Sequence, residues 1–329
     1  KEKEKEKGKK MDTPEPVLPV IDMSLPVEER AKDLMKACVE TGFFYVINHS
    51  ISDEKIDTVF QQSKLFFQQE TSWKLNYLAD KNGRGYTRMG EETLDPKVQT
   101  QGDTKEGYYL GRESEEENFP LHGNNQWPDE SIVPQWKEVM SDYIKQMGDI
   151  GFELNKTLAV GLGFKEDYFE PFFSRPFLTL RLLRYAPTRS VPEEGVFGCG
   201  AHSDYGMWTL LKTDDVPGLQ IQTTDKRWVD VQPLESAFIV NLGDMLERWT
   251  GGLFKSTVHR VVNKQGKERF SIPFFFEPNF DSKIYPLPSP QIQEYVKESG
   301  QEWEEVISGE WLLGKYADTH TDISVDKAA

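Results

Sequence analysis

Residues 198–211 read GCGAHSDYGMWTLL, in which a glycine-rich approach leads through a histidine and an aspartate into an apolar run. Successive side chains of a β-strand point to opposite faces, so His202 and Asp204 are predicted to share one face of a strand. An imidazole and a carboxylate placed in this way can bind the same metal ion. Such a site needs a third ligand from elsewhere in the chain.

The third ligand is predicted to be His259, which lies in a second strand-like segment, residues 256–262. Two imidazoles and one carboxylate are the set that binds Fe(II) on one face and leaves the opposite positions open. Zinc accepts the same ligands, so the set alone does not fix the metal. A later pair, His320 and Asp322, has no histidine after it and is interpreted as solvated surface, and His49 is interpreted as a packing residue.

Ten residues after His259, the segment 269–274 reads RFSIPF and places Arg269 and Ser271 on one strand face. A guanidinium fork and a hydroxyl together suit a carboxylate. Because an unpaired buried arginine is costly, an arginine beside a metal site predicts an anion there.

Seven short segments with a period near two follow residue 176, separated by Gly, Pro, Asp or Asn, and they are residues 177–185, 207–211, 218–222, 227–231, 237–241, 256–262 and 269–276. Short strands at this spacing are typical of a sandwich or barrel, most simply a jelly roll.

Helical periodicity surrounds these strands. The start of the chain predicts a helix–strand–helix opening, with a helix at 27–41, a buried strand at 43–47 and a second helix capped by Ser52. A long amphipathic helix is predicted at 134–162, backing the sheet, and a last helical segment at 291–316. The fold class is therefore mixed α and β, a jelly-roll core with an N-terminal αβα region and backing helices.

The predicted organisation is one domain behind a short tail. Residues 1–10 read KEKEKEKGKK, with nothing to bury, and are interpreted as a disordered tail or tag. Residues 11–329 are predicted to form a single domain, whose parts are an N-terminal helical and loop region (11–130), a helix plus jelly-roll core (131–290) and a C-terminal helical segment and tail (291–329).

Charge and cysteine content limit the partners. The net charge is −16, from 39 Lys and Arg against 55 Asp and Glu, which argues against a nucleic-acid or anionic-membrane partner. The two cysteines, Cys38 and Cys199, are far apart and form no disulfide framework or zinc pattern. With no apolar run of membrane-spanning length and no signal peptide, a cytoplasmic, monomeric protein is expected.

In this order, the motifs resemble those of the iron(II)- and 2-oxoglutarate-dependent dioxygenases, in the branch that includes isopenicillin N synthase and the large plant oxygenase set. The segments that carry the resemblance are LPVID (18–22), GFFYVINH (42–49), HSD (202–204), NLGDML (241–246), HRV (259–261) and RFS (269–271).

The resemblance implies a jelly-roll enzyme that uses Fe(II), 2-oxoglutarate and O₂, with ascorbate as a possible reductant, to oxidise a C–H bond of a small metabolite. Hydroxylation, with release of succinate and CO₂, is the expected reaction, and desaturation and ring closure stay open. The implied iron ligands are His202, Asp204 and His259.

The same resemblance places Arg269 and Ser271 on the far carboxylate of 2-oxoglutarate and adds Tyr185 as a further contact. Around Tyr185 the chain reads LRYAP (183–187), which departs from the plant pattern Asn-Tyr-Tyr-Pro-Pro.

Two rival functions remain at this point. Some enzymes of the same branch carry the Arg-x-Ser pair without using 2-oxoglutarate, and a non-catalytic jelly-roll binding protein could keep the residues by descent. The substrate is expected to be small and partly apolar, and able to carry a carboxylate. Candidate walls of its site are Tyr109, Arg181 and Phe276, with Arg84, Arg88 and Tyr108 from the irregular stretch 83–117, a candidate lid.

Overall fold

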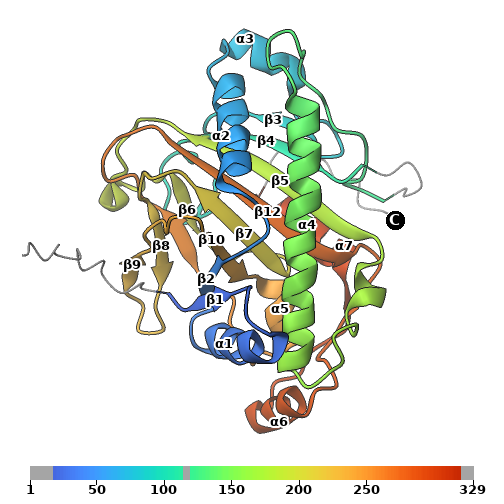
Figure 1. Cartoon of the computed structure of the whole chain (residues 1–329). Helices are drawn as coiled ribbons and strands as arrows, with labels where there is room; N and C mark the ends of the chain where they lie inside the picture. Colours follow the sequence, from blue (N-terminus) through green and yellow to red (C-terminus); the bar gives the residue numbers. More distant parts are fainter. Residues whose placement is uncertain (1–17, 114–118, 320–329) are drawn as a thin grey trace, which may run out of the picture.

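Two β-sheets face each other in the computed structural model, which describes residues 18–113 and 119–319 (Figure 1). The larger sheet runs in the spatial order β1 (Val20–Asp22), β2 (Phe43–Ile47), β10 (Phe238–Leu242), β7 (Trp208–Thr213), β12 (Arg269–Asn279), β5 (Pro176–Tyr185), β4 (Lys105–Gly111) and β3 (Gly85–Thr87). The smaller sheet runs β6 (Cys199–His202), β11 (His259–Val261), β8 (Leu219–Gln222) and β9 (Trp228–Asp230). This pair of sheets is the expected jelly-roll core.

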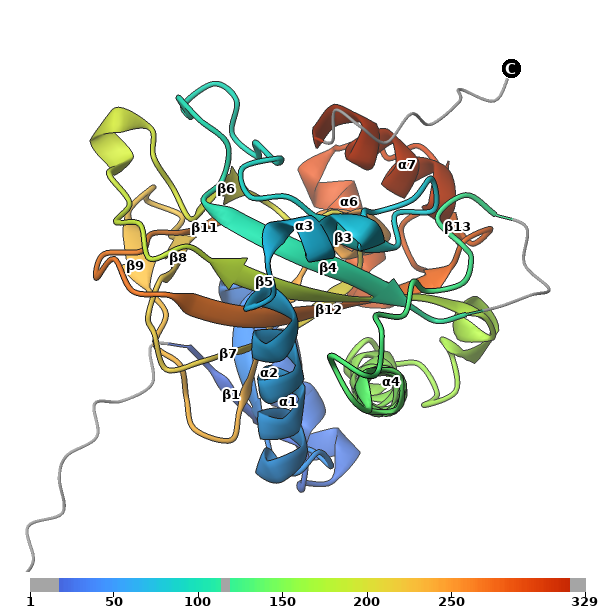
Figure 2. The same cartoon turned by 90° about the horizontal axis from the view of Figure 1, so that it is seen from above.

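Helices cover the outer face of the larger sheet, as Figure 2 shows from above. They are α1 (Val27–Glu40), α2 (Asp53–Phe67) and α4 (Trp136–Gly161), and the short helix α3 (Thr71–Lys74) follows α2 near β3. The ion pair between Arg30 and Glu153, with 2.8 Å between Nη2 and Oε2, joins α1 to α4. The predicted helices at 27–41 and 134–162 and the helix capped by Ser52 are confirmed within two residues at each end. None of the helices in the described ranges is long and apolar enough to cross a membrane.

Further short elements complete the chain. These are α5 (Asp244–Trp249), α6 (Pro290–Ser299), α7 (Ser308–Thr319), the strands β13 (Lys283–Ile284) and β14 (Val306–Ile307), and single 3₁₀ turns at Leu75–Tyr77, Glu170–Phe173 and Pro192–Glu194.

Side chains alternate along the strands of the larger sheet, so that one face packs against the helices and the other lines a cavity. On β12, residues Phe270, Ile272, Phe274 and Phe276 belong to the apolar core under the helices, whereas Arg269, Ser271, Pro273 and Phe275 line a cavity between the sheets. On β5, Leu178, Leu180 and Leu182 likewise face the helices, and Arg181, Leu183 and Tyr185 face the cavity. One strand face therefore holds the fold together and the other carries the polar groups.

The N-terminal segment is part of the same sheet. Strand β2 pairs antiparallel with β10, with Tyr45 opposite Ile239, and parallel with β1. Phe43 and Tyr45 pack between the sheets with Leu219 and Ile239, while Phe44 of the same strand packs under the helices. The first strands thus extend the wall of the cavity.

Three sequence expectations are corrected. The stretch 83–117 is not irregular throughout, because β3 and β4 form within it and extend the sheet beside β5. The segment 291–316 is not one helix, because Gly300 ends α6 with a φ of 64° and β14 separates it from α7. Asp204 is not on a strand, because β6 ends at His202. The N-terminal tail 1–10 and the pair His320 and Asp322 lie outside the described residues.

The long helix approaches the sheet through a glycine. A Cβ at Gly151 would lie 2.4 Å from the ring of Phe276, which is stacked on Phe173. Because this ring cannot move aside freely, Gly151→Ala is expected to lower the free energy of unfolding by about 1–3 kcal/mol. Gly148→Ala is the matched control, since its Cβ would meet Leu178 at an ordinary 3.5 Å. Denaturant unfolding measures both, and equal stability of the two variants would contradict this account.

Candidate active site

His202, Asp204 and His259 meet at one end of the cavity. His202 ends β6 and His259 begins β11, directly opposite it in the antiparallel register. The turn after β6 brings Asp204 back toward both rings, so that its Oδ1 lies 3.6 Å from the Nε2 atom of each histidine. All three potential ligand atoms lie within 4.8 Å of one another. The three residues singled out in the sequence are therefore neighbours, although the turn and not strand alternation places Asp204.

Backbone carbonyls orient both imidazoles. Nδ1 of His202 lies 2.8 Å from the carbonyl oxygen of Gly200, and Nδ1 of His259 lies 3.1 Å from that of Thr257. A carbonyl accepts a hydrogen bond, so Nδ1 carries the proton in each ring, and the Nε2 lone pair is available to a metal. The rings therefore fit a metal centre in tautomer as well as in position.

Two side chains hold the Asp204 carboxylate from behind. Its Oδ2 accepts hydrogen bonds from the hydroxyl of Thr209 at 2.6 Å and from the amide of Asn241 at 2.7 Å. Thr209 and Asn241 are cross-strand neighbours on β7 and β10. With Oδ2 occupied, Oδ1 is directed to the histidines. The sequence analysis gave neither residue a role, although Asn241 opens the quoted segment NLGDML and each is a polar residue within a predicted strand.

Charges within the cluster act on metal binding in two directions: Asp204 stays ionised and His259 neutral, which favours a metal, whereas His202 retains a proton. Burial opposes ionisation of Asp204, but His259, His202 and Asn241 outweigh it and hold the pKa of Asp204 well below its usual range. Burial, with the neighbouring His202, lowers the pKa of His259 to about 4. Burial also opposes a proton on His202, but Cys199 and Asp204 outweigh it and raise the pKa of His202. A metal must therefore displace a proton from His202, so metal affinity falls in acid.

The hydrogen bond from Thr209 gives a clean test of this support. Thr209→Val keeps the shape of the side chain and removes the donor to Asp204. Groups that orient a metal ligand typically contribute about 10- to 100-fold to metal affinity, and a loss of that size is expected. Thr213→Val, four residues along the same strand, is the control. Fe(II) titration under anaerobic conditions measures both variants, and unchanged affinity in Thr209→Val would remove this role.

The inner chamber, a cavity of about 80 Å³, extends from the metal cluster to Arg269, Ser271 and Tyr185. Arg269 is fully buried, donates from Nε to the carbonyl oxygen of Val216 at 3.1 Å, and packs over the ring of Tyr185 at 4.8 Å. Its Nη1 is buried without a hydrogen-bond partner among the described residues. The Ser271 hydroxyl lies 3.5 Å from the Tyr185 hydroxyl. A carboxylate at this end would satisfy the guanidinium.

Cys199 lines the same chamber but is not part of the metal cluster. It is a buried free thiol, with its Sγ 3.9 Å from Nδ1 of His202 and 3.5 Å from the ammonium of Lys105.

The outer chamber, of about 60 Å³, opens on the other side of His202 and Asp204. The two chambers share Leu94, Arg181, His202, Asp204 and Phe275 in their walls. The outer chamber adds Glu92, Tyr109, Tyr205, Gly206, Glu277, Leu312 and Tyr316. Two sequence candidates for the substrate site, Tyr109 and Arg181, thus lie in its wall.

The prediction for Phe276 is wrong. Its side chain is fully buried on the helix-facing side of β12, stacked on Phe173, while its neighbour Phe275 lines both chambers. Tyr108, another candidate that does not line a chamber, also lies in the apolar core under the helices, where it packs against Phe66 and Trp136. The alternation of side chains along each strand was expected, but the prediction assigned these two residues to the wrong face.

A buried ionic network forms one wall of the outer chamber. Glu92 pairs with Arg181 and, at 3.0 Å, with Lys105, which also pairs with Asp103. The Asp103 carboxylate accepts a hydrogen bond from the backbone N–H of Gly200 at 2.8 Å, in the strand that carries His202. Arg181 also packs over the ring of Tyr109 at 4.4 Å. Opposite charges are therefore matched within this network.

Glu277 stands apart from that network. Its carboxyl is buried and accepts a hydrogen bond from the backbone N–H of Met207 at 2.5 Å. A Cβ at Gly206 would lie 1.7 Å from Oε1 of Glu277, so the glycine lets the carboxyl reach this position. Burial, reinforced by the charge on Asp204, raises the pKa of Glu277 to about 8.

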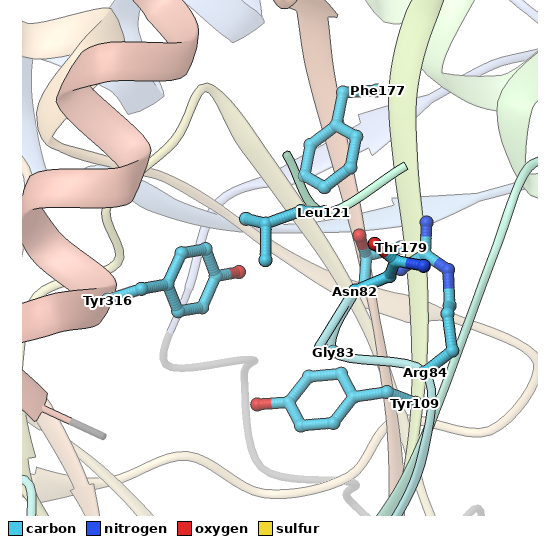
Figure 3. A pocket seen from close by; sticks show the side chains of 8 residues that line it. All are labelled: Asn82, Gly83, Arg84, Tyr109, Leu121, Phe177, Thr179 and Tyr316. Carbon is cyan, nitrogen blue, oxygen red and sulfur yellow. The ribbon is translucent and has the colours of Figure 1, made fainter. Parts of the chain in front are cut away.

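A third, narrow pocket lies behind the outer chamber and shares Tyr109 and Tyr316 with it. Figure 3 shows Tyr316 facing Leu121 and Asn82 across this pocket, with the guanidinium of Arg84 and the ring of Phe177 in its wall. Arg84 was a sequence candidate for the substrate site. Glu92, Tyr205, Glu277 and Tyr316 were missed, since no motif marks them.

Comparison with known proteins assigns the two halves of the chain separately. Residues 18–130 match the family model described as non-haem dioxygenase in morphine synthesis N-terminal, and residues 178–278 match that of the 2OG-Fe(II) oxygenase superfamily. The matches cover the segment that builds β1 to β4 and the strands β5 to β12.

Whole-length relatives agree. A probable iron/ascorbate oxidoreductase of Dictyostelium discoideum is 33% identical, over 93% of this chain and 95% of its own length. A homoarginine-6-hydroxylase of Arabidopsis thaliana is 32% identical, over 93% and 90%. A Neurospora crassa protein, in its crystal structure with alpha-KG and thymine, superposes with a TM-score of 0.81 at 30% identity, over 94% of this chain and 98% of that one.

Proposed function

The chain belongs to the 2-oxoglutarate- and Fe(II)-dependent oxygenase superfamily, and on that premise we propose that His202, Asp204 and His259 hold its iron. The protein is an oxidoreductase of the 2-oxoglutarate-dependent dioxygenase type, with Fe(II), 2-oxoglutarate and ascorbate as its cofactors. One observation carries the assignment of ligands: two Nε2 atoms and one carboxylate oxygen converge, each oriented by its own hydrogen bonds.

The inner chamber suits 2-oxoglutarate. Arg269 and Ser271, with Tyr185 beside them, lie at the end of the chamber away from the iron ligands and offer donors to a carboxylate. The buried, unpaired Nη1 of Arg269 supports this placement because it requires an anion.

Fe(II) and 2-oxoglutarate, when bound, would together activate O₂, one atom of which would enter succinate as CO₂ is released while the other oxidises a C–H bond of the substrate. The side chains supply the rest. Asp204 contributes one negative charge and is kept ionised by its neighbours. Arg269 fixes the cosubstrate's orientation, while Leu94, Leu183, Leu219 and Phe275 give the chamber an apolar wall that excludes water.

The outer chamber is the proposed site of the substrate, because it adjoins the iron ligands and ends in a different set of polar groups. The named relatives concern homoarginine in one case and thymine in another, and both are small, nitrogen-rich molecules. We therefore propose a small nitrogen-containing metabolite as the substrate class.

Hydroxylation is the proposed outcome. A turnover experiment with an identified substrate tests it by mass spectrometry, where a product heavier by one oxygen atom is expected. A product lighter by two hydrogens would show desaturation or ring closure.

An anaerobic spectroscopic titration tests the cosubstrate site itself. Adding 2-oxoglutarate to the Fe(II)-loaded protein is expected to produce a metal-to-oxoacid charge-transfer absorption band. Iron binding without such a band would favour the oxidase that does not use 2-oxoglutarate, and absence of iron binding would favour the non-catalytic binding protein.

A further inference from the structure

Two buried ionisable groups near the iron centre make no ion pair among the described residues. They are Glu277 in the outer chamber and Arg84 in the narrow pocket behind it. Burial of an isolated charge is costly, and such groups persist in folded proteins when something else supplies the partner. Both groups lie in the walls of cavities, so a ligand can supply it.

Glu277 has one recorded hydrogen bond within the described chain, from the backbone N–H of Met207. The neighbouring cations are already paired, because Arg181 and Lys105 both contact Glu92, and Lys105 also contacts Asp103. The charges at the iron centre cancel among themselves, because the two carboxylates of the proposed cosubstrate and that of Asp204 offset the charges of Fe(II) and Arg269. With a pKa raised to about 8, Glu277 is largely protonated in the empty chamber, and it is the acid that a cationic nitrogen would hold in its ionised form.

Aromatic walls strengthen this preference. Tyr109, Tyr205, Phe275 and Tyr316 line the same chamber as Glu277. The faces of aromatic rings attract cations, and a carboxylate surrounded by rings is a combination that suits ammonium or guanidinium groups. A neutral amide would leave the Glu277 carboxyl protonated, whereas a cationic nitrogen would pair with the carboxylate and form the stronger, charge-assisted hydrogen bond.

Arg84 is the complementary group. Its side chain is 2% exposed, its guanidinium lies 5.9 Å from the ring of Phe177, and its Nε has no hydrogen-bond partner among the described residues. Burial lowers the pKa of Arg84 to about 10, so it stays a cation at neutral pH. Its carboxylate neighbours Asp80 and Glu113 accept hydrogen bonds from backbone N–H groups, of Asn82 and Asn125 respectively.

The two sites are connected through shared walls. Tyr109 and Tyr316 border both the outer chamber and the Arg84 pocket, and Figure 3 shows both rings lining the pocket that Arg84 also lines. The two pockets therefore adjoin at these tyrosines, which is the arrangement that a ligand spanning both of them needs.

We propose that the substrate is a small zwitterion, with its cationic nitrogen bound by Glu277 beside the iron and its carboxylate bound by Arg84. The inference rests on the proposed function, since it takes the outer chamber as the substrate site. It also fixes the region that is oxidised: the reacting C–H bond belongs to the end of the molecule that carries the cationic nitrogen.

Calorimetry on the anaerobic holoenzyme, loaded with Fe(II) and 2-oxoglutarate, tests this directly because binding is measured without turnover. The probes are 4-guanidinobutyrate, L-arginine and L-homoarginine, each compared with its neutral ureido isostere and with its carboxamide, and thymine serves as a neutral ring. At least one guanidino acid is expected to bind about tenfold or more tightly than its isostere, its amide and thymine. If none binds, or if the neutral compounds bind equally well, the proposal is overturned.

Two variants separate the two ends. Glu277→Gln keeps an acceptor for Met207 N–H and should erase the preference for guanidino over ureido compounds. Arg84→Met keeps the packing on Phe177 and should erase the preference for the acid over its amide. Glu247→Gln is the matched control, since Glu247 also accepts one backbone N–H, from Ser256 at 2.7 Å, away from the chambers. Equal weakening of all probes in Glu277→Gln would show a structural role and contradict the assignment.

The charge-transfer band that 2-oxoglutarate forms with the Fe(II)-loaded protein distinguishes failure of the zwitterion proposal from failure of the proposed function. A protein that forms the band with 2-oxoglutarate but does not discriminate charge retains its function and loses the zwitterion proposal. A protein that forms no band loses the function on which the proposal rests.

Discussion

Asp204→Ala is expected to abolish oxygenase turnover and to lower Fe(II) affinity by more than about 100-fold, because loss of a ligand exceeds the effect of removing a group that only orients one. The variant removes the carboxylate oxygen that lies 3.6 Å from both Nε2 atoms. It also leaves the donors of Thr209 and Asn241 without their acceptor. Calorimetric or spectroscopic Fe(II) titration under anaerobic conditions gives the affinity.

The control for this variant is Asp225→Ala, at an exposed turn position where the carboxylate pairs with Arg227. Its iron affinity and turnover should equal those of the unmodified protein. If Asp204→Ala kept both properties, the metal would have to be held elsewhere, and the proposed centre would be wrong.

Arg269→Gln is the second variant with a large expected effect, and it acts on the cosubstrate. Truncating one partner of a buried charge pair costs roughly 2–5 kcal/mol, or about 30-fold to several thousandfold in affinity. The affinity for 2-oxoglutarate should fall by that amount, while the affinity for Fe(II) stays unchanged because Arg269 lies at the far end of the chamber from the ligands.

Arg269→Lys refines this test. Lysine keeps the charge but lacks the planar fork, so it should recover part of the lost affinity for 2-oxoglutarate. The intensity of the charge-transfer band, followed as 2-oxoglutarate is added, gives the affinity of the unmodified protein, of Arg269→Gln and of Arg269→Lys for this cosubstrate. Equal affinity in Arg269→Gln would mean that the dicarboxylate is anchored by other residues.

Much of the core could be predicted because its strands repeat a simple pattern. The segments around Arg269 and Leu180 alternate between two faces, and the register of β12 against β5 agrees with the predicted strand positions. The three proposed metal ligands could be singled out because histidine is rare in this chain, with five in 329 residues, and because the two histidines and the aspartate occur in the order seen in the family that the sequence resembles.

The phase of alternation was harder to predict. In β12, Phe274, Phe275 and Phe276 are equally apolar, so composition does not reveal which of them faces the cavity. Gly151 decides it in three dimensions by making room on the helix for the ring of Phe276. That contact joins residues far apart in sequence and leaves no local signal.

The outer chamber was the least predictable part for a related reason. Glu92, Glu277 and Tyr316 come from a loop, the end of β12 and α7, and none belongs to a motif. A lone glutamate in a sequence is normally a surface residue. Glu277 becomes a candidate only in the folded chain, where it is buried beside the iron ligands without a cationic partner among the described residues.

The central claim is that this cavity couples the oxidation of a substrate to the breakdown of 2-oxoglutarate, and succinate release measures that coupling most directly. With Fe(II), ascorbate, O₂ and a small nitrogen-containing substrate, the protein is expected to convert 2-oxoglutarate to succinate. The release should stop when O₂ is withheld and should disappear in Asp204→Ala. Oxidation of a substrate without any succinate, by protein that binds iron normally, would contradict the account.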